Sequence, residues 1–511
     1  MSTGVRDRRS GILLHPTSLE GPHGAGDLGE GAHRFAGWLA AGGQRVWQVL
    51  PLGPTGYGES PYQALSARAG NPALVSLERL RDEGWLADAD LASPPAGVPG
   101  RADLAGVERW KRERLARAAE RFRAGAPPAA ASALAAFRSR EAAWLEDWTL
   151  FRALKDAHAG APWTRWPAAL ARRDDVSLRD ARGDLDREVY AEAFVQWTFE
   201  RQWSALRQRC AALGVKLLGD LPIYPAHDSV EVWAHAHLFR LDGGGEPVAV
   251  AGVPPDYFSA TGQRWGNPLH DWEASAAEGH RTWVARVRGV LARVDRIRLD
   301  HFRGFEAFWE VPAAAPDASS GRWVPGPGPP FFEALQAALG PLPFVAENLG
   351  VVTPEVEALR RRFGLPGMAI LQFAFGNDPQ APTFRPHAYT PDTAAYTGTH
   401  DNDTVVGWWT GGAGASVRSD DDVAREKAFA TAYLASDGRE IHWDMIRALA
   451  ASVADDAIFP MQDVLGLGSA GRMNTPATLG GNWSWRLRPG ELRTEDAARL
   501  ARLVELYGRH G

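Results

Sequence analysis

The sequence predicts an α/β protein, specifically a (β/α)8 TIM barrel with mainly helical insertions and no separate C-terminal β-domain. Short apolar runs recur along the chain, and several of them end in a polar or charged residue. Most are too short for helices and are typical of buried parallel strands. Amphipathic helix patterns fill many of the gaps between them. Eight such strands that alternate with helices indicate a barrel.

Each predicted strand is defined by its apolar run and by the polar, glycine or proline residues that follow it. The clearest helix is predicted over residues 184–213, where apolar residues recur at helical spacing up to Gly214, a residue type that often follows a helix end. Thr353-Pro354 is a helix-start signal. The predicted strands are residues 11–14, 45–50, 215–218, 296–299, 343–346, 368–373, 393–397 and 457–461.

The length beyond an ordinary barrel is concentrated between the second and third predicted strands. Helical patterns occur there around residues 104–122 and 130–157. We therefore expect a single catalytic barrel domain over residues 1–511, with a helical insertion subdomain over residues 78–200 that rises from the mouth of the barrel.

Composition narrows the functional classes. The 511 residues are 45% hydrophobic and 23% charged, as in ordinary soluble globular proteins. The net charge of −6 argues against nucleic acid and anionic membranes as partners. The single cysteine, Cys210, excludes an internal disulfide, and we find neither a signal peptide nor an apolar run of about 18 residues. We expect a cytoplasmic protein, with a monomer or loose dimer as the default state.

Four acids stand at the ends of predicted strands, namely Asp220, Asp300, Glu347 and Asp401. The catalytic residues of a barrel come from the carboxyl ends of its strands, so these acids are expected to face one cleft. Each acid alone is more often a helix cap or a solvated loop residue, but four at four strand ends indicate a cluster.

The strands before Asp300 and Glu347 are expected to be neighbours, about 4.8 Å apart. That spacing suits the ~5–5.5 Å carboxyl separation of a retaining glycosidase. Arg298 lies two residues before Asp300, on the same side of the strand, and is expected to keep this nucleophile ionised. Glu347 follows an apolar run that favours a raised pKa, as a general acid requires. Asp401, beside His400, is expected to hold sugar hydroxyls and favour the transition state.

Other groups of residues give weaker evidence for a functional site. His227, His235 and His237 lie close together, but no carboxylate spacing completes a metal site, so ordinary hydrogen-bonding histidines are favoured. Residues 466–471 match a dinucleotide-binding pattern but leave no room for the βαβ unit that must follow. A phosphate loop and the Gly-Xaa-Ser-Xaa-Gly motif of esterases are both missing.

Several long motifs in this order resemble the amylomaltases, which are bacterial 4-α-glucanotransferases called disproportionating enzymes in plants and are related to the α-amylases. The resemblance covers nearly the whole chain and is weakest over residues 80–200. The motifs include DLPIYPAHDS (220–229), RLDHFRG (298–304), AENLG (346–350) and THDNDT (399–404).

The resemblance implies Asp300 as nucleophile, Glu347 as general acid/base and Asp401 as transition-state stabiliser. The residues that it implies for substrate binding are Tyr57, Tyr62, Asp220, Tyr257, Phe258, Arg298 and His400. Residues 252–268 resemble the family's mobile lid, from which we expect a lid insertion over residues 225–290. No metal and no cofactor are implied.

The function predicted in this way is a 4-α-glucanotransferase, which moves a segment of an α-1,4-glucan to the 4-hydroxyl of glucose or another glucan. Its donors would be α-1,4-glucans and maltooligosaccharides, and glucose or glucans would be the acceptors. A simple α-glucanase is the alternative enzyme, in which water attacks in place of sugar. A carbohydrate-binding protein on a catalytically dead barrel is the alternative from another class, but all three acids are present.

Overall fold

The computed structural model confirms the barrel. It describes residues 7–95, 97–255, 259, 261–412, 419–478 and 480–511. Eight parallel strands close in the order β1-β12-β11-β10-β9-β6-β3-β2, and each matches one of the eight predicted strands. They are β1 (Arg9–Leu13), β2 (Val46–Gln48), β3 (Lys216–Leu221), β6 (Arg296–Leu299), β9 (Phe344–Ala346), β10 (Gly367–Ile370), β11 (Thr393–Tyr396) and β12 (Asp456–Pro460).

The barrel closes because β1 pairs with β2 on one side and with β12 on the other. Most residues of its strands are buried, in keeping with the side-chain-filled interior expected of an eight-stranded barrel. The fully buried Tyr396 of β11 donates a hydrogen bond across the interior to Oε1 of Gln48 on β2, at 2.9 Å. This bond satisfies two polar groups that would otherwise be costly to bury.

Helices cover the outside of the barrel between successive strands. The long helix predicted over 184–213 is present as α7, which ends before the left-handed Gly214. The covering helices are α1 (Glu30–Ala41), α7 (Asp186–Ala212), α10 (Arg281–Leu291), α11 (Gly328–Leu339), α12 (Pro354–Arg362), α15 (Ile441–Ala451) and α17 (Thr494–Tyr507).

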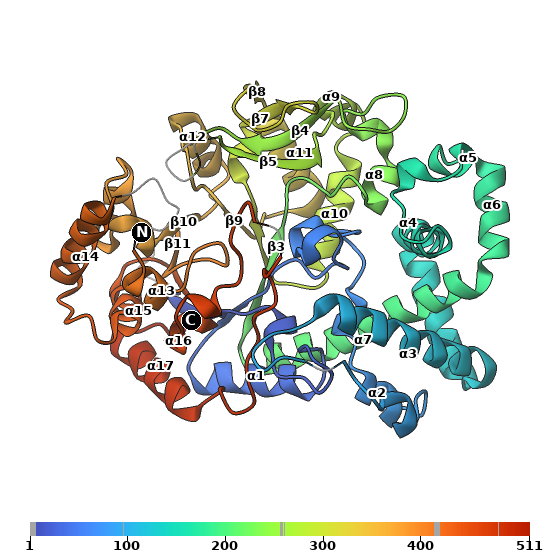
Figure 1. Cartoon of the computed structure of the whole chain (residues 1–511), viewed down its shortest axis with the longest axis horizontal. Coiled ribbons are helices and arrows are strands. Elements are labelled where there is room, and N and C mark those ends of the chain that lie inside the picture. Colours follow the sequence, from blue (N-terminus) through green and yellow to red (C-terminus); the bar gives the residue numbers. More distant parts are fainter. Residues whose placement is uncertain (1–6, 96, 256–258, 260, 413–418, 479) are drawn as a thin grey trace.

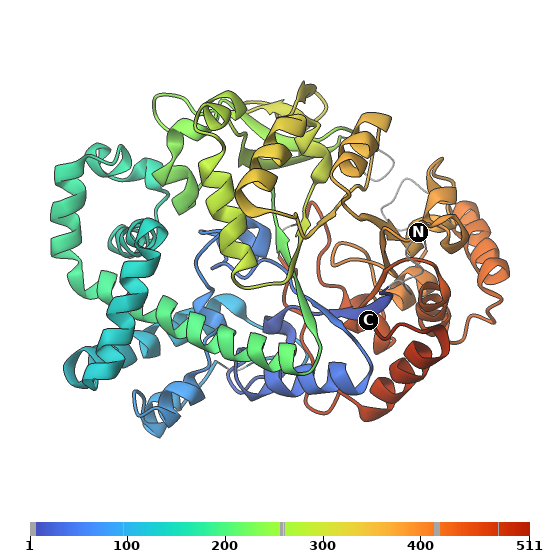
Figure 2. The same ribbon diagram turned by 180° about the vertical axis from the view of Figure 1, so that it is seen from behind.

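The segment between β2 and β3 forms an arm of helices at one edge of the molecule (Figure 1). Figure 2 shows α7 running back from this arm toward the barrel. The two long helices of the arm lie where the sequence patterns predict them. The arm and its base contain α2 (Leu77–Asp82), α3 (Leu104–Gly125), α4 (Pro128–Ala157), α5 (Ala168–Ala171) and α6 (Asp175–Asp184).

A second, four-stranded antiparallel sheet of order β5-β4-β7-β8 lies beside the barrel, at the top of Figure 1. The sequence prediction of mainly helical insertions missed it. Its strands contain glycine and proline, as in Gly252 and the Gly266-Asn267-Pro268 run, so they lack a clear alternation of apolar and polar residues. The strands are β4 (Ala249–Val253), β5 (Gln263–Pro268), β7 (Ala307–Pro312) and β8 (Arg322–Pro325).

The remaining helices are short or lie near the carboxyl half of the barrel. None of the helices in the described residues is long and apolar enough to cross a membrane. These helices are α8 (Val230–Ala234), α9 (Trp272–Ala277), α13 (Val405–Thr410), α14 (Asp420–Leu434) and α16 (Met461–Val464).

Candidate active site

The predicted acids meet at the carboxyl ends of the barrel strands. Strands β6 and β9 are neighbours, and Leu299 pairs with Ala346 at their last residues. Asp300 and Glu347 follow these two residues directly, so the two acids leave adjacent strands at the same level. Asp220 pairs in register with Arg298 between β3 and β6. The strand order therefore confirms the adjacency expected for the catalytic pair.

Arg298 is the buried cation at the centre of this cluster. Its Nη1 lies 2.8 Å from Oδ2 of Asp220 and 2.9 Å from Oδ1 of Asp300. The hydroxyl of Tyr62 donates a further hydrogen bond to Oδ2 of Asp220 at 2.8 Å. Although burial disfavours the charge of Arg298, the two carboxylates outweigh it and raise the pKa of the guanidinium. Arg298 therefore stays charged and holds both acids in place.

The ionisation of Asp300 differs in part from the expectation. Arg298 favours the carboxylate, as predicted, but burial of Asp300 has the larger effect, and the nearby Asp220 acts in the same direction. Together they raise the pKa of Asp300 to about 6. Asp300 is still mostly ionised at neutral pH. The sequence showed the cation beside this acid but not the burial and the second carboxylate that oppose its effect.

Glu347 is held by backbone donors. The N–H of His301 donates to Oε2 at 2.7 Å and that of Leu349 to Oε1 at 3.2 Å. His301 has a left-handed backbone with φ 51°, which forms part of the sharp turn after β6. Burial, aided by the charge of Asp300, raises the pKa of Glu347 to about 8 against the opposing effect of Arg298. Glu347 is thus mostly protonated at neutral pH, as predicted from the apolar run that precedes it.

Asp401 has the opposite electrostatic environment. Its Oδ2 lies 3.3 Å from Nε2 of His400, and Nδ2 of Asn474 donates to its Oδ1 at 2.6 Å. Burial favours the protonated carboxyl, but His400 and Asn474 outweigh burial and hold the pKa of Asp401 well below its ordinary value. At neutral pH Asp300 and Asp401 are therefore ionised while Glu347 is mostly protonated, because the three acids have different neighbours.

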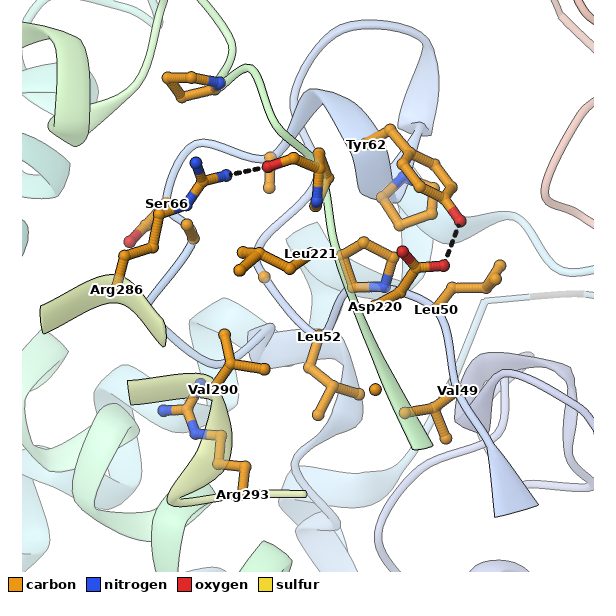
Figure 3. Close-up of a pocket in the computed structure, with 18 of the residues that line it drawn as sticks. Val49, Leu50, Leu52, Tyr62, Ser66, Asp220, Leu221, Arg286, Val290 and Arg293 are labelled. Carbon is orange, nitrogen blue, oxygen red and sulfur yellow. Dashed lines mark hydrogen bonds between the residues drawn. The ribbon is translucent and has the colours of Figure 1, made fainter. Parts of the chain in front are cut away.

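Aromatic rings line the same end of the cleft. The rings of Tyr62 and His400 stack with centroids 5.0 Å apart and an angle of 21° between their planes. Trp483 lies against both rings at 5.8 Å. Figure 3 shows Tyr62 bonded to Asp220 at the edge of a small cavity of about 50 Å³ whose wall includes Leu50 and Leu221. The wall of this cavity is mostly apolar. The buried Asp220 carboxylate is therefore satisfied by its hydrogen bonds with Tyr62 and Arg298.

The cleft has a volume of about 450 Å³, large enough for several sugar rings. Sequence reasoning assigned no role to several of the residues that line it. Asn474 and Trp483 lie in the segments RMNTP (472–476) and GNWSWR (481–486), which also resemble the family and were the available signal for these two residues. The second sheet and the loop after β10 supply the others. The cleft residues without a predicted role include Trp265, Trp323, Phe373, Asn474 and Trp483.

Not every predicted binding residue lies in this cleft. Tyr57 is 73% exposed and is absent from the described residues that line the cleft. Asp220 is absent from them as well, because its side chain is fully buried behind Tyr62 and Arg298. Tyr257 and Phe258 lie outside the described residues. The role predicted for each of these residues stays a prediction.

The clustered histidines have ordinary partners. Nε2 of His227 lies 2.8 Å from the carbonyl oxygen of Gly245, and Nε2 of His237 lies 2.8 Å from Oε1 of Glu278. Within the described ranges, no group of three or more histidine, cysteine, aspartate or glutamate side chains is arranged to hold a metal ion.

The fold and the site together define a class of protein. The closed parallel barrel gathers three acids, a buried arginine and aromatic rings at one cleft, and two of the acids are ionised at neutral pH while the third is mostly protonated. This combination is that of a glycoside-processing barrel enzyme.

Comparison with known proteins narrows this class. A family model described as 4-alpha-glucanotransferase matches residues 14–493. The chain is 50% identical over 506 residues to a 4-alpha-glucanotransferase of Thermus thermophilus, with 98% of each chain covered. It is 47% identical over 505 residues to one from Synechocystis, again with 98% of each covered. Its structure is similar to that of an amylomaltase from Streptococcus agalactiae in complex with acarbose, with a TM-score of 0.92 and 36% sequence identity. The match covers 98% of this chain and 99% of the amylomaltase chain.

The chain therefore belongs to the 4-alpha-glucanotransferase family, as its motifs predict. It is an enzyme of the glycosyltransferase type, a 4-alpha-glucanotransferase.

Proposed function

We propose that Asp300, Glu347 and Asp401 carry out this transfer by a double displacement in which Asp300 is the nucleophile, Glu347 the general acid/base and Asp401 the transition-state stabiliser. The single observation that carries the proposal is that adjacent strands present one mostly ionised and one mostly protonated carboxyl at neutral pH. A pair of acids whose pKa values are separated in this way supplies the two roles that the reaction needs.

In the first displacement, a carboxylate oxygen of Asp300 forms a bond to the anomeric carbon of the donor glucan. The glycosidic bond from that carbon breaks, and its oxygen takes the proton of Glu347 as the chain departs. In the second displacement, the Glu347 carboxylate removes the proton from the 4-hydroxyl of an acceptor. The acceptor oxygen then attacks the anomeric carbon, and the bond to Asp300 breaks. Two inversions give overall retention and regenerate both groups.

Asp401 acts through charge and orientation. Its carboxylate stays ionised through its contacts with His400 and Asn474. A fixed negative charge beside the reacting sugar stabilises the positive charge that develops at the anomeric carbon in the transition state. Each oxygen of a carboxylate has more than one lone pair, so Asp401 can still accept hydrogen bonds from sugar hydroxyls.

The donor sugar is bound by the other predicted residues of the cluster. Asp220 is buried and positions the donor sugar through its bonds to Tyr62 and Arg298, and the stacked Tyr62 and His400 rings form an aromatic wall. Tyr57, Tyr257 and Phe258 contact the glucan farther from the cleavage point. The insertion over residues 225–290 acts as the lid beside the cleft, in line with the contribution of Gln263 and Trp265 to the cleft wall.

Donors are α-1,4-glucans and maltooligosaccharides, and the acceptor is the 4-hydroxyl of glucose or of another glucan. The helical insertion over residues 78–200 is a subdomain of the single catalytic domain. We place the enzyme in the cytoplasm, because a chain with a single cysteine suits a reducing compartment. A monomer or loose dimer is proposed, and light scattering of the purified protein measures this directly.

The experiment that tests the proposed function is incubation of the purified enzyme with maltotriose and separation of the products by chromatography. A ladder of longer maltooligosaccharides together with free glucose is expected. Shorter sugars alone would indicate hydrolysis and contradict the proposed sugar acceptor.

The nucleophile is tested by a matched pair of variants on one strand. Asp295 immediately precedes β6, at the end opposite Asp300, and bonds the backbone N–H of Leu217. Asp300→Asn should lose nearly all turnover while it still binds glucan, whereas Asp295→Asn should keep its activity. Full activity in Asp300→Asn would remove Asp300 as the nucleophile.

A further inference from the structure

One tryptophan differs from the others in the described part of the chain. Trp323, on β8, is the only tryptophan there that counts among the exposed large apolar side chains, and it is 37% exposed. It also lines the catalytic cleft. An exposed aromatic ring in a binding cleft offers a large flat apolar face to a ligand, and sugar rings present matching apolar faces.

The ring of Trp323 is held in a fixed orientation. The guanidinium carbon of Arg303 lies 3.7 Å from the centroid of the ring, in a cation–π contact. Arg303 is itself buried, and its Nη1 donates a hydrogen bond to the carbonyl oxygen of Val351. Trp309, the cross-strand partner of Trp323 on β7, contacts it at 5.2 Å and 69°. A flat ring that is already ordered loses little entropy when a sugar stacks on it.

The loop that follows Glu347 connects this ring to the catalytic pair. Val351 is four residues beyond Glu347, lines the same cleft and is 49% exposed. Arg303 follows Asp300 by three residues and joins Val351 to the Trp323 ring. Trp323 and Val351 are thus two exposed apolar side chains in the cleft wall that Arg303 links, on the Glu347 side of the site.

The position of these two side chains relative to Glu347 identifies the part of the glucan that they meet. A general acid protonates the oxygen of the departing chain, so it lies on the leaving-group side of the broken bond. The donor pocket of Tyr62, Asp220 and His400 is built by other strands and loops of the barrel. The wall that continues past Glu347 therefore borders the sugars on the departing side, where the acceptor later binds.

We propose that Trp323, oriented by Arg303, is a stacking platform on the acceptor side of the cleft, and that it binds an acceptor glucose beyond the first one. The inference rests on the proposed function and adds a residue that determines acceptor length. Glucose alone fills only the first acceptor position and does not reach the platform. Maltotriose reaches it, so Trp323 favours longer acceptors over glucose.

The test compares acceptors of different length with one donor, for wild-type enzyme and Trp323→Ala. The acceptor KM for maltotriose should rise about tenfold in the variant, as expected for the loss of one aromatic stacking contact, while the KM for glucose stays within about twofold. Trp323→Phe should restore most of the preference, because it keeps a flat ring. Trp323→Leu keeps apolar volume without a flat ring and should behave like Trp323→Ala.

Phe429→Ala is the matched control, because Phe429 is an exposed aromatic residue, 41% accessible, on α14 and outside the cleft. It should change neither KM. An equal change in KM for glucose and maltotriose in Trp323→Ala and Trp323→Leu, or no change in either, would overturn the proposal. Failure of the proposed function itself is distinguishable, since the wild-type enzyme would then form no ladder from maltotriose.

Discussion

The pH dependence of catalysis follows from the separated pKa values of Asp300 and Glu347. The reaction needs Asp300 ionised and Glu347 protonated. The ionised form of Asp300 is lost as the pH falls below about 6, and the protonated form of Glu347 is lost as the pH rises above about 8. We expect a bell-shaped profile of kcat/KM with limbs near these two values and its maximum between them. On each limb the rate should change about tenfold per pH unit.

The assay is the initial rate of glucose release from maltotriose, measured from about pH 4.5 to pH 9.5 at constant ionic strength, a range that spans both limbs. Because the two carboxyls interact, the limbs report the pair as a whole. Glu347→Gln cannot ionise, so it should remove the alkaline limb and lower the maximal rate by roughly 10²–10⁴. Asp295→Asn should leave both limbs unchanged. A profile that is flat from about pH 5 to pH 9, or an alkaline limb that persists in Glu347→Gln, would refute the assignment of the acid.

Three further predictions concern stability and the support of the site. The folded enzyme retains the Glu347 proton up to about pH 8, whereas the unfolded chain releases it near pH 4.5. Glu347 therefore contributes stability at low pH that is lost as the pH rises. Glu347→Gln should raise Tm over that of the wild type more at pH 8 than at pH 5. Lys111 is fully buried and donates to Asp27 and to two carbonyl oxygens. Lys111→Met should lower the free energy of unfolding in urea by about 3–5 kcal/mol, while Lys216→Met, at an exposed lysine, should change it little. Asp463 accepts hydrogen bonds from the Thr397 hydroxyl and the Val405 N–H, at the two ends of the loop that carries Asp401. Asp463→Ala should lower kcat by about a hundredfold. Asp463→Asn can still hydrogen-bond the Thr397 hydroxyl and the Val405 N–H, so it should retain much of the wild-type kcat. Equal losses of kcat in the two variants would contradict a positioning role.

The barrel and the identity of the acids were predictable from local patterns. Strands buried on both faces are continuous apolar runs, and the residue after each run is a candidate for the active site. Asp300 and Glu347 follow such runs directly, and pairing of Leu299 with Ala346 brings them to the same level, as strand order predicts. The second sheet was missed because glycine and proline interrupt its strands, and its pairing of β4 with β7 joins segments far apart in the sequence.

What the sequence alone determined about this protein is its eight-stranded barrel, its family and the acids at the strand ends, because strand periodicity and long motifs are local properties of the chain. The tertiary structure decided the charge state of each acid and the shape of the cleft. Asp300, Glu347 and Asp401 are ordinary carboxyls in sequence, and their pKa values diverge only because burial, Arg298 and His400 surround them differently. Likewise Trp323 is one of 21 tryptophans until the fold exposes it beside Arg303 in the cleft. Desolvation and stacking depend on neighbours from distant parts of the chain, which only folding brings together.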